Sequence, residues 1–499
     1  MPAWWLLERN VARFGAHVAL RELDHDTLAE RRVLTYEALW RAARGTASGL
    51  RARGVGPGDR VGYCLPNGAD LVTGYYATWA AGGAVVPANP LAREAELTEQ
   101  LGDAAVALIV GAAGSAAEQA AARLGVDFVG VEAFRALAGR PPAAPAPCAP
   151  DDVAVILYTG GTTGTPKGAM LSHRNIVVNT VQFAEWYALA PGEETAVAAI
   201  PMYHSGGMSG VMNVPLYAAA TLLVFGRFGA GGMARAVTRY RATRLFGVPT
   251  MFIALLDDPE GRRADYSSLR ACRTNAAPLP PAVKRAFDEL VGREVLVEGY
   301  GLTEASPLTH ANPVGRARAG SIGVPLPDTD ARIVDESGAD VTPGEPGELL
   351  VRGPQVMLGY WQRPAETAAA LAGGWLRTGD IARMDGEGYF SIVDRSKDVI
   401  NTAGFKVWPR EVEETLSLHP AVRQAAVVGV PDDYRGETVK AFVVLRDGPA
   451  PRPSAEDIIG FCRDRLTPYK APRMVEFRDE LPMTTTGKLL RRELRGWDY

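Results

Sequence analysis

Cysteine and histidine are scarce in this chain of 499 residues, which contains four cysteines and six histidines. The cysteines, Cys64, Cys148, Cys272 and Cys462, lie far apart in the sequence and form no paired spacing. We therefore expect neither a disulfide framework nor a zinc site built on closely spaced ligands. A reducing compartment is the simplest setting, and the sequence predicts a cytoplasmic protein.

Long apolar runs and a charge excess are also missing. The longest apolar stretch, residues 211–225, is interrupted by Asn213 and Pro215. It is shorter than the ~20 residues that span a bilayer, so no transmembrane segment is expected. The formal net charge is −4 and most basic residues are dispersed, which argues against a nucleic-acid-binding surface. We expect small-molecule partners and a monomer or homodimer.

The spacing of apolar residues predicts an α/β fold. Between about residues 30 and 150, amphipathic helices such as 36–53 alternate with short apolar strands such as 60–65 and 84–87. This alternation is typical of a parallel sheet covered by helices. Residues 330–391 show short strands separated by glycine-rich turns, which predicts a β-rich subdomain.

A domain boundary is predicted near Asp394. It gives a large N-terminal domain, residues 1–393, and a small α+β C-terminal domain, residues 394–499. The helices predicted in the small domain are 411–418 and 455–466, and the strands are 425–430 and 439–445.

A loop rich in glycine and threonine follows a predicted apolar strand at residues 155–157. It reads YTGGTTGTPKG, residues 158–168. Glycines let backbone N–H groups approach phosphate oxygens, threonine hydroxyls donate further hydrogen bonds, and Lys167 adds a positive charge. A flexible surface turn is the alternative, but turn chemistry explains this composition poorly. Gly168 stands where P-loop ATPases carry the Ser or Thr that holds magnesium, so a different ATP chemistry is predicted.

This loop resembles the signature of the adenylate-forming superfamily, which includes acyl-CoA synthetases, firefly luciferase and the adenylation domains of peptide synthetases. Further segments resemble motifs of that superfamily in the same order: PMYHSGG (201–207), GYGLTE (299–304), RTGD (377–380), DRSKD (394–398) and TTTGKLLRREL (484–494). The resemblance covers nearly the whole chain. It is closest to medium- and long-chain fatty acyl-CoA ligases, because of YTGGTTG, LTEASPLTHANP and GPQVMLGYWQRP.

The resemblance implies an ATP-dependent acyl-CoA ligase that forms AMP. A carboxylate is a poor electrophile, because its delocalised charge repels nucleophiles and its oxygen leaves badly. Attack on the α-phosphate of ATP converts it to an acyl adenylate with release of pyrophosphate, and the thiol of coenzyme A then displaces AMP. Both steps crowd negative charge, so positioned cations and N–H donors should provide most of the catalysis. ATP, Mg²⁺ and coenzyme A are expected, with a medium- or long-chain fatty acid.

The resemblance also assigns roles to residues of the large domain. Thr303 is expected to contact the phosphates, Glu304 to hold magnesium, and Tyr300 to stack on adenine. Asp380 is expected to accept hydrogen bonds from both ribose hydroxyls, and Arg395 to reach the ribose or phosphate. The predicted ATP- or AMP-binding residues are Thr159, Gly160, Gly161, Thr162, Thr163, Gly164, Lys167, Asn275, Ala276, Ala277, Glu298, Gly299, Tyr300, Gly301, Asp380 and Arg395. A solvated carboxylate for Glu304 and a turn role for Asp380 are the alternatives.

Lys488 resembles the catalytic lysine of the superfamily. It is expected to bridge the attacking carboxylate and the α-phosphate in the first step. A lysine close to Arg491, Arg492 and Arg495 could instead belong to the solvated face of a helix. The polar segment before it, residues 484–487, favours a loop that delivers one lysine into a cleft.

Lys397 matches the hinge about which the small domain of the superfamily rotates between the two half-reactions. The rotation is expected to withdraw Lys488 and to bring Gly404, Phe405 and Lys406 to the site, where Gly404 leaves room for the pantetheine arm. The segment Thr402-Ala403-Gly404 stands where many members carry Ser-Gly-Gly, which bears on rates more than on reaction type.

Residues 203–215 are expected to line the acyl channel, with His204 facing the site. The predicted pocket residues are Tyr203, Ser205, Gly206, Gly207, Met208 and Met212. Small and pliable side chains leave room for an apolar chain. The stretch contains no Arg or Lys that would pair with a second carboxylate, which favours a monocarboxylic acid. A structural imidazole is the alternative for His204.

Other functions stay open at this point. The first alternative is a related enzyme. It could be a CoA ligase for an aryl or other acid, or an acyl-AMP ligase that loads a carrier protein. The absence of a carrier domain after Lys488 and of a long insertion before the hinge favours free coenzyme A as acceptor. A non-catalytic nucleotide sensor is the other, and the presence of Glu304, Lys397 and Lys488 argues against it.

Overall fold

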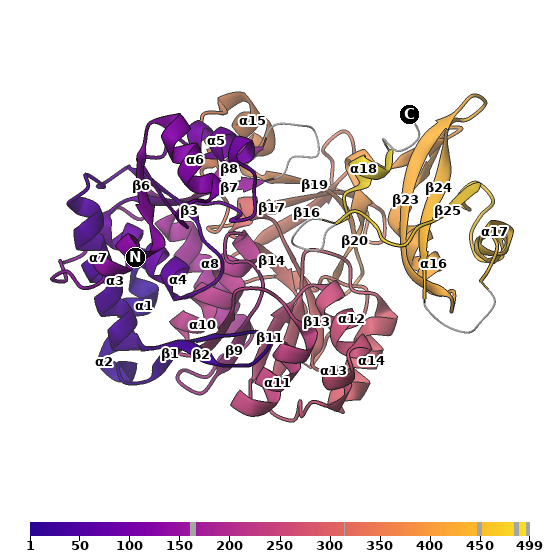
Figure 1. Cartoon of the computed structure of the whole chain (residues 1–499). Helices are drawn as coiled ribbons and strands as arrows, with labels where there is room; N and C mark the ends of the chain where they lie inside the picture. Colours follow the sequence, from indigo (N-terminus) through magenta and orange to yellow (C-terminus); the bar gives the residue numbers. More distant parts are fainter. Residues whose placement is uncertain (160–165, 314, 447–451, 484–488, 496–499) are drawn as a thin grey trace.

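The computed structural model describes residues 1–159, 166–313, 315–446, 452–483 and 489–495. Two large helix-covered sheets and a smaller sheet form the N-terminal part, and a further sheet with its own helices lies at the opposite end of the molecule (Figure 1). The predicted α/β architecture, with a large N-terminal and a small C-terminal part, is confirmed.

A seven-stranded sheet carries the glycine-rich loop. Its strand order is β18 (Gly359–Tyr360), β8 (Lys167–Ser172), β7 (Val153–Thr159), β4 (Ala84–Pro87), β3 (Arg60–Cys64), β5 (Leu108–Gly111) and β6 (Asp127–Gly130). Strands β4, β3, β5 and β6 pair in parallel, which confirms the parallel sheet predicted before residue 150.

A nine-stranded sheet forms the other large layer. Its order is β15 (Val324–Pro325), β14 (Leu308–Ala311), β13 (Leu296–Gly301), β12 (Ala271–Thr274), β11 (Arg244–Gly247), β9 (Thr195–Ala198), β10 (Thr221–Phe225), β1 (Val18–Leu23) and β2 (Glu30–Thr35). The strands from β13 to β1 run parallel. Their carboxyl ends therefore share one edge, where ligands bind in open α/β sheets.

The helices cover these sheets with their apolar faces. The N-cap of helix α3 (Tyr36–Arg51) is Thr35, whose side chain accepts a hydrogen bond from the Ala38 N–H. The helix buries Leu39, Ala43 and Leu50. The others are α1 (Trp5–Glu8), α2 (Val11–Phe14), α4 (Ala69–Ala81), α5 (Glu94–Asp103), α6 (Ala116–Leu124), α7 (Val131–Leu137), α8 (His173–Trp186), α9 (Ser205–Gly207), the π-helix η1 (Met208–Asn213), α10 (Val214–Tyr217), α11 (Ala230–Tyr240), α12 (Pro249–Asp257), α13 (Pro259–Arg263), α14 (Pro281–Val291) and the short η2 (Thr303–Ala305).

A four-stranded antiparallel sheet stands where a β-rich subdomain was predicted. It consists of β16 (Asp330–Val334), β17 (Gly347–Arg352), β19 (Leu376–Met384) and β20 (Phe390–Arg395). Helices α15 (Pro364–Ala370) and η3 (Ala372–Gly374) interrupt the strands. A small core of its own, which includes Ile333, Leu349 and Phe390, holds this sheet together.

The C-terminal part follows β20 through η4 (Ser396–Asp398). Its strands are β21 (Ile400–Thr402), β22 (Phe405–Val407), β23 (Val422–Asp432), β24 (Gly436–Leu445) and β25 (Met474–Phe477), and its helices are α16 (Pro409–Ser417), α17 (Ala455–Arg463) and α18 (Arg491–Arg495). The predicted helices and strands are all present, with ends shifted by up to three residues. In the described part of the chain, no helix has both the length and the apolar character needed to cross a membrane.

Candidate functional site

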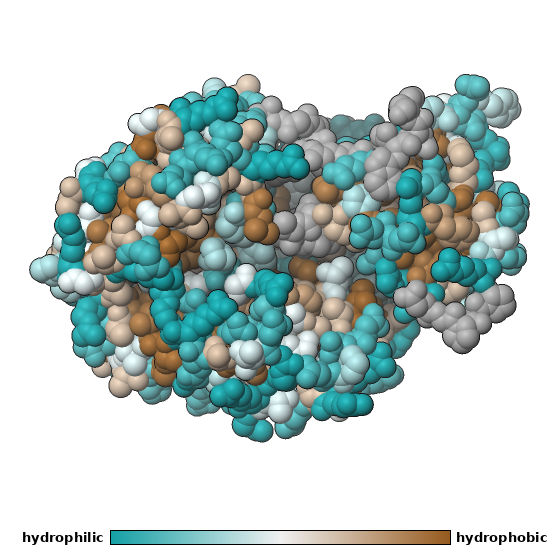
Figure 2. Space-filling view, viewed as in Figure 1, coloured by the Kyte–Doolittle hydropathy of each residue, from teal (hydrophilic) through white to brown (hydrophobic). Residues whose placement is uncertain are grey.

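The glycine-rich loop joins two paired strands. Strands β7 and β8 are antiparallel, and Thr159 stands opposite Lys167 where the loop leaves and rejoins the sheet. The loop's predicted phosphate-binding residues Gly160, Gly161, Thr162, Thr163 and Gly164 lie outside the described residues, as does Lys488. On the face shown in Figure 2, the surface is hollowed between the large and the small part of the molecule.

Glu304 lies close to the lysine at the end of this loop. Strand β18 pairs with β8, so that Tyr360 stands opposite Ala169. The Tyr360 hydroxyl donates a hydrogen bond of 2.9 Å to the Glu304 carboxylate, and the Lys167 ammonium lies 5.4 Å from the centre of the Tyr360 ring. The Met357 N–H also donates to the Glu304 carbonyl at 2.8 Å. A carboxylate, a tyrosine and a cation are therefore gathered beside the loop.

Burial, followed by the neighbouring Glu304 carboxylate, raises the pKa of Tyr360 well above its usual value. Tyr360 therefore stays a hydrogen-bond donor, which orients the carboxylate. Magnesium is usually held by one or two carboxylates together with substrate phosphates. Glu304 has such a carboxylate, beside a loop whose composition suits phosphate, so these residues fit the ion.

The predicted acyl and phosphate residues meet at Thr303. The hydroxyls of Ser205 and Thr303 share a hydrogen bond of 3.1 Å, and the Ser209 hydroxyl donates to the Ser306 carbonyl at 2.8 Å. These bonds join α9 and η1 to the η2 segment. His204 directly precedes α9, and its ring lies 4.7 Å from that of Tyr203.

The predicted acyl residues differ in the space around them. Open space surrounds the position of a β-carbon at Gly206, whereas one at Gly207 would lie 1.9 Å from the Pro201 carbonyl oxygen. Gly207 is therefore required by close packing, and Gly206 is the position that leaves room. Met208 and Met212 are fully buried.

A second group of predicted nucleotide residues lies on strands of two sheets, with Tyr300 on β13 and the other two residues on β19 and β20. The Tyr300 hydroxyl donates to the Asp380 carboxylate at 2.5 Å, and Arg395 lies 3.6 Å from the other oxygen of that carboxylate. Asp380 and Arg395 are cross-strand partners on β19 and β20. Burial, then the nearby Asp380 charge, raises the pKa of Tyr300 well above its usual value. The carboxylate is thus held by one donor and one cation.

Two of the predicted ATP- or AMP-binding residues present buried acceptors without partners. The side-chain oxygen of Asn275 and one carboxyl oxygen of Glu298 are buried and form no hydrogen bond within the described structure. An exocyclic amine such as that of adenine offers the donors that such oxygens require. Ala276 adopts a φ of +76°, a conformation in which glycine is less strained. An alanine at this position therefore adds local backbone strain that a glycine would avoid.

Burial raises the pKa of Glu298 to about 7. The folded state then holds a proton on Glu298 that the unfolded chain releases at lower pH, so stability falls as pH rises from about 4.5 to about 7. Glu298→Gln removes this titrating group. The melting temperature of the variant minus that of the wild type should therefore increase by about 3 °C from pH 5 to pH 8. Thermal unfolding of both proteins across that range measures the difference. A constant difference would mean that Glu298 is ionised throughout.

The predicted hinge and coenzyme A residues lie on the C-terminal side of β20. Lys397 lies in η4, and burial, followed by the charge of Arg395, lowers its pKa. Gly404 has a φ of +85° in the turn between β21 and β22, with open space where a β-carbon would stand. Phe405 is 55% exposed and stacks on Tyr469, and Lys406 pairs with Glu336 at 2.8 Å. No described contact joins this turn to Thr303 or Glu304.

Charged contacts surround the hinge on both sides. Arg491 of α18 lies 2.7 Å from Glu413, 3.5 Å from Asp398 and 3.9 Å from Asp394. In α16, the Arg410 backbone N–H donates to the Asp394 carboxylate at 2.8 Å, and its guanidinium donates to the Ile392 carbonyl at 2.7 Å. Residues before and after Lys397 are therefore bound to the same two arginines.

Tyr360 is a site residue that the sequence did not single out. It lies in GPQVMLGYWQRP, a segment used for the resemblance but given no role. Its position more than 50 residues after Glu304 gives no local signal, and only the β8–β18 pairing brings the two together.

The sequence profile of the AMP-binding enzyme family matches residues 7–361, and that of the AMP-binding enzyme C-terminal domain matches residues 411–488. The chain is 41% identical to the long-chain-fatty-acid--CoA ligase of Bacillus subtilis (strain 168), over 92% of this chain and 89% of the relative. It is 40% identical to a feruloyl-CoA synthase of Amycolatopsis sp, over 93% of each chain. The crystal structure of ATP-bound MatB from Rhodopseudomonas palustris superposes with a TM-score of 0.91, at 32% identity, over 99% of this chain and 98% of the other.

Proposed function

This chain belongs to the AMP-binding enzyme family, and from that premise we propose that it is an AMP-forming acyl-CoA ligase. It joins a carboxylic acid to coenzyme A through an acyl adenylate, with consumption of ATP and release of AMP and pyrophosphate. The observation that carries this proposal is the grouping of Glu304, Tyr360 and Lys167 beside the glycine-rich loop, with Thr303 next in sequence.

Each residue of the site has a role in bringing negative groups together. Lys167 and Thr303 contact phosphate oxygens, and Asp380 accepts hydrogen bonds from the ribose while Tyr300 and Arg395 hold its carboxylate. Glu304 would hold Mg²⁺, which supplies charge neutralisation at the phosphates when bound. Lys488 neutralises the charge that builds up as the acid's oxygen meets the α-phosphate.

The second half-reaction uses a different orientation of the small domain, residues 394–499, relative to residues 1–393. Lys397 is the hinge, and Gly404, which has open space where a side chain would stand, lies beside the pantetheine arm. Cytoplasmic location and a monomeric or dimeric state stay predictions.

The acid is a medium- or long-chain fatty acid in this proposal. Support comes from the relatives named long-chain-fatty-acid--CoA ligase and from the open space at Gly206 beside buried methionines. The similarity to a feruloyl-CoA synthase favours an aryl acid as the second candidate.

A panel of acids tests the proposal. Acetate to palmitate, benzoate, ferulate and malonate are each incubated with ATP and Mg²⁺, with and without coenzyme A, and pyrophosphate and thioester are measured. We expect thioester and AMP with the longer fatty acids. Pyrophosphate release without thioester would remove the ligase assignment and leave adenylation. A preference for ferulate or benzoate would establish the second candidate.

Tyr360→Phe removes the donor that orients Glu304 and keeps the ring beside Lys167. A hydrogen bond to a charged group contributes about 1.5–3 kcal/mol, so we expect adenylation to slow about tenfold or more. We also expect a higher Mg²⁺ concentration for half-maximal rate. Pyrophosphate release as a function of Mg²⁺ measures both quantities.

Tyr240→Phe is the matched control for that variant. The Tyr240 hydroxyl donates to the Glu30 carboxylate at 3.0 Å, so the same type of bond is lost between α11 and β2, which contribute no residue to the predicted site. If both variants lose the same activity with unchanged Mg²⁺ dependence, Tyr360 has no special relation to the metal.

A further inference from the structure

A buried arginine stands beside the predicted acyl pocket without a carboxylate partner. Arg273, the third residue of β12, is 9% exposed. Its guanidinium lies 3.6 Å, 4.2 Å and 4.7 Å from the ring centres of Phe183, Tyr187 and Phe246. Burial is the main cause that lowers the pKa of Arg273 to about 10, so it remains a cation at neutral pH.

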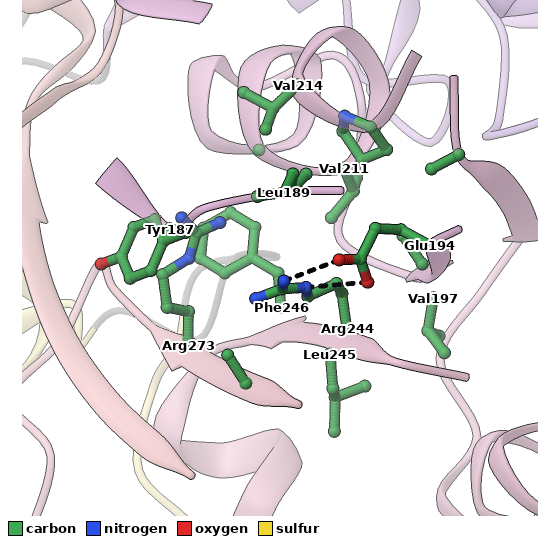
Figure 3. A pocket seen from close by; sticks show the side chains of 15 residues that line it. Tyr187, Leu189, Glu194, Val197, Val211, Val214, Arg244, Leu245, Phe246 and Arg273 are labelled. Atoms are coloured by element: carbon green, nitrogen blue, oxygen red, sulfur yellow. Dashed lines mark hydrogen bonds and ion pairs between the residues drawn. The ribbon is translucent and has the colours of Figure 1, made fainter. Parts of the chain in front are cut away.

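The charges nearby leave this cation uncompensated. Glu194 lies in the same region, but it is already paired with Arg244 at 2.7 Å (Figure 3), and it also lies 3.4 Å from Arg270. Burial raises the pKa of Tyr187 to about 12, so its phenol is neutral, and its oxygen forms no hydrogen bond of good geometry. Among the described residues, no carboxylate lies within ion-pair distance of Arg273. A buried cation without a counter-ion is costly unless a ligand supplies one.

A cavity of about 30 Å³ adjoins this guanidinium. Its wall includes Tyr187, Val211, Val214, Phe246 and Arg273, several of which Figure 3 shows around one space. A site for one water requires roughly 10–15 Å³, so the cavity accepts one small group and no further length of chain. The wall is apolar apart from a few side chains, so Arg273 is the unpaired charge that a ligand meets there.

The cavity lies against the helical segment that carries the predicted acyl residues. Gly210, Val211 and Val214 line it, and they follow Met208 on the same continuous helical segment. Ser205, which contacts Thr303, lies five residues before Gly210, or about 7 Å of helical rise. A β-carbon at Gly210 would lie 2.2 Å from the Phe246 ring, so a glycine is needed for this wall to close.

We propose that Arg273 is a specificity residue, which pairs with a second carboxylate at the end of the substrate remote from the carboxyl that is activated. Within the proposed class, the preferred substrate is thus a medium-chain fatty acid that carries a second carboxyl at its far end. The inference rests on the proposed function and revises the expectation of a monocarboxylic acid, because the cation comes from β12 and not from residues 203–215.

Matched acids test this assignment in the wild-type enzyme. Hexanoate, octanoate and decanoate are compared with adipate, suberate and sebacate, and kcat/KM for thioester formation is measured for each pair. We expect one dicarboxylate to exceed its monocarboxylate by about tenfold or more. Preference for the monocarboxylate at every length would overturn the inference and leave the ligase intact, whereas absence of thioester from every acid would overturn both.

Arg273→Met and Arg273→Lys locate the effect in the guanidinium. Arg273→Met should lower kcat/KM for the preferred dicarboxylate about tenfold or more and leave that of the monocarboxylate unchanged or raised. Arg273→Lys keeps the charge and should retain part of the preference. Activity with the monocarboxylate shows that each variant is folded. Equal losses for both acids in both variants would give Arg273 a purely structural role.

Discussion

Lys488→Ala should lose acyl-adenylate formation by about a hundredfold to a thousandfold, the usual cost of removing one group that stabilises charge in a transition state. The carboxylate and the α-phosphate repel each other, and the ammonium reduces that repulsion only while they are being joined. The second half-reaction has no such encounter at this position. Thioester formation from added acyl adenylate and coenzyme A should therefore keep most of its wild-type rate.

Two measurements separate the steps: the burst of pyrophosphate in rapid quench, and thioester formed from synthetic acyl adenylate. Lys470→Ala serves as the control, because it removes an ammonium of the same domain that pairs with Glu411 at 2.7 Å. We expect it to adenylate at nearly the wild-type rate. If Lys488→Ala slowed both half-reactions equally, the lysine would have a general structural role.

Lys397→Pro should give the reverse pattern, with adenylation retained and thioester formation reduced by about a hundredfold or more. Lys397 lies in a short 3₁₀ helix, whose usual φ is close to that of proline, so the present conformation tolerates the substitution. Rotation about this residue requires its backbone dihedrals to change, which the proline ring prevents. The enzyme would therefore stay in the orientation of the first step.

Lys397→Ala distinguishes the backbone from the side chain. It removes the ammonium and leaves the dihedrals free, so its thioester activity should exceed that of the proline variant by a wide margin. Similar defects in both variants would indicate that the amine, and not the backbone, is needed. Thioester formation from added acyl adenylate and coenzyme A is then measured for Lys397→Pro. A low rate places the block at the rotation, because the first half-reaction is bypassed.

The sequence predicted local elements well because their signals are local. Strand β4 was expected at residues 84–87 and lies there, and α3 ends two residues earlier than predicted. The β-rich subdomain followed from its glycine-rich turns. Pairing between distant segments could not be predicted in this way. Strands β1 and β2, which end at residue 35, join a sheet whose other strands lie between residues 195 and 325, through the pairing of β1 with β10.

The candidate site shows the same difference between residues with local sequence signals and residues brought in by tertiary structure. Asp380 and Arg395 were identified through short motifs, and their cross-strand pairing follows from β19 and β20. Tyr360 and Arg273 were not assigned roles, because neither belongs to a motif with a known role. Each acts through tertiary neighbours: a carboxylate on η2 for Tyr360, and rings from α8, Tyr187 and β11 for Arg273.

The two arginines that bind residues on both sides of the hinge bear on the energetics of turnover. Any swing about Lys397 separates Ile392 and Asp394 from α16 and α18, so the contacts of Arg410 and Arg491 with them must break together. Asp398 and Glu413 travel with Arg491 and keep it neutralised throughout. If the small domain rotates as proposed, the two orientations are therefore discrete states and the motion is not a gradual drift. The free energy needed to break these contacts is partly electrostatic. The equilibrium between the two orientations should therefore depend on ionic strength.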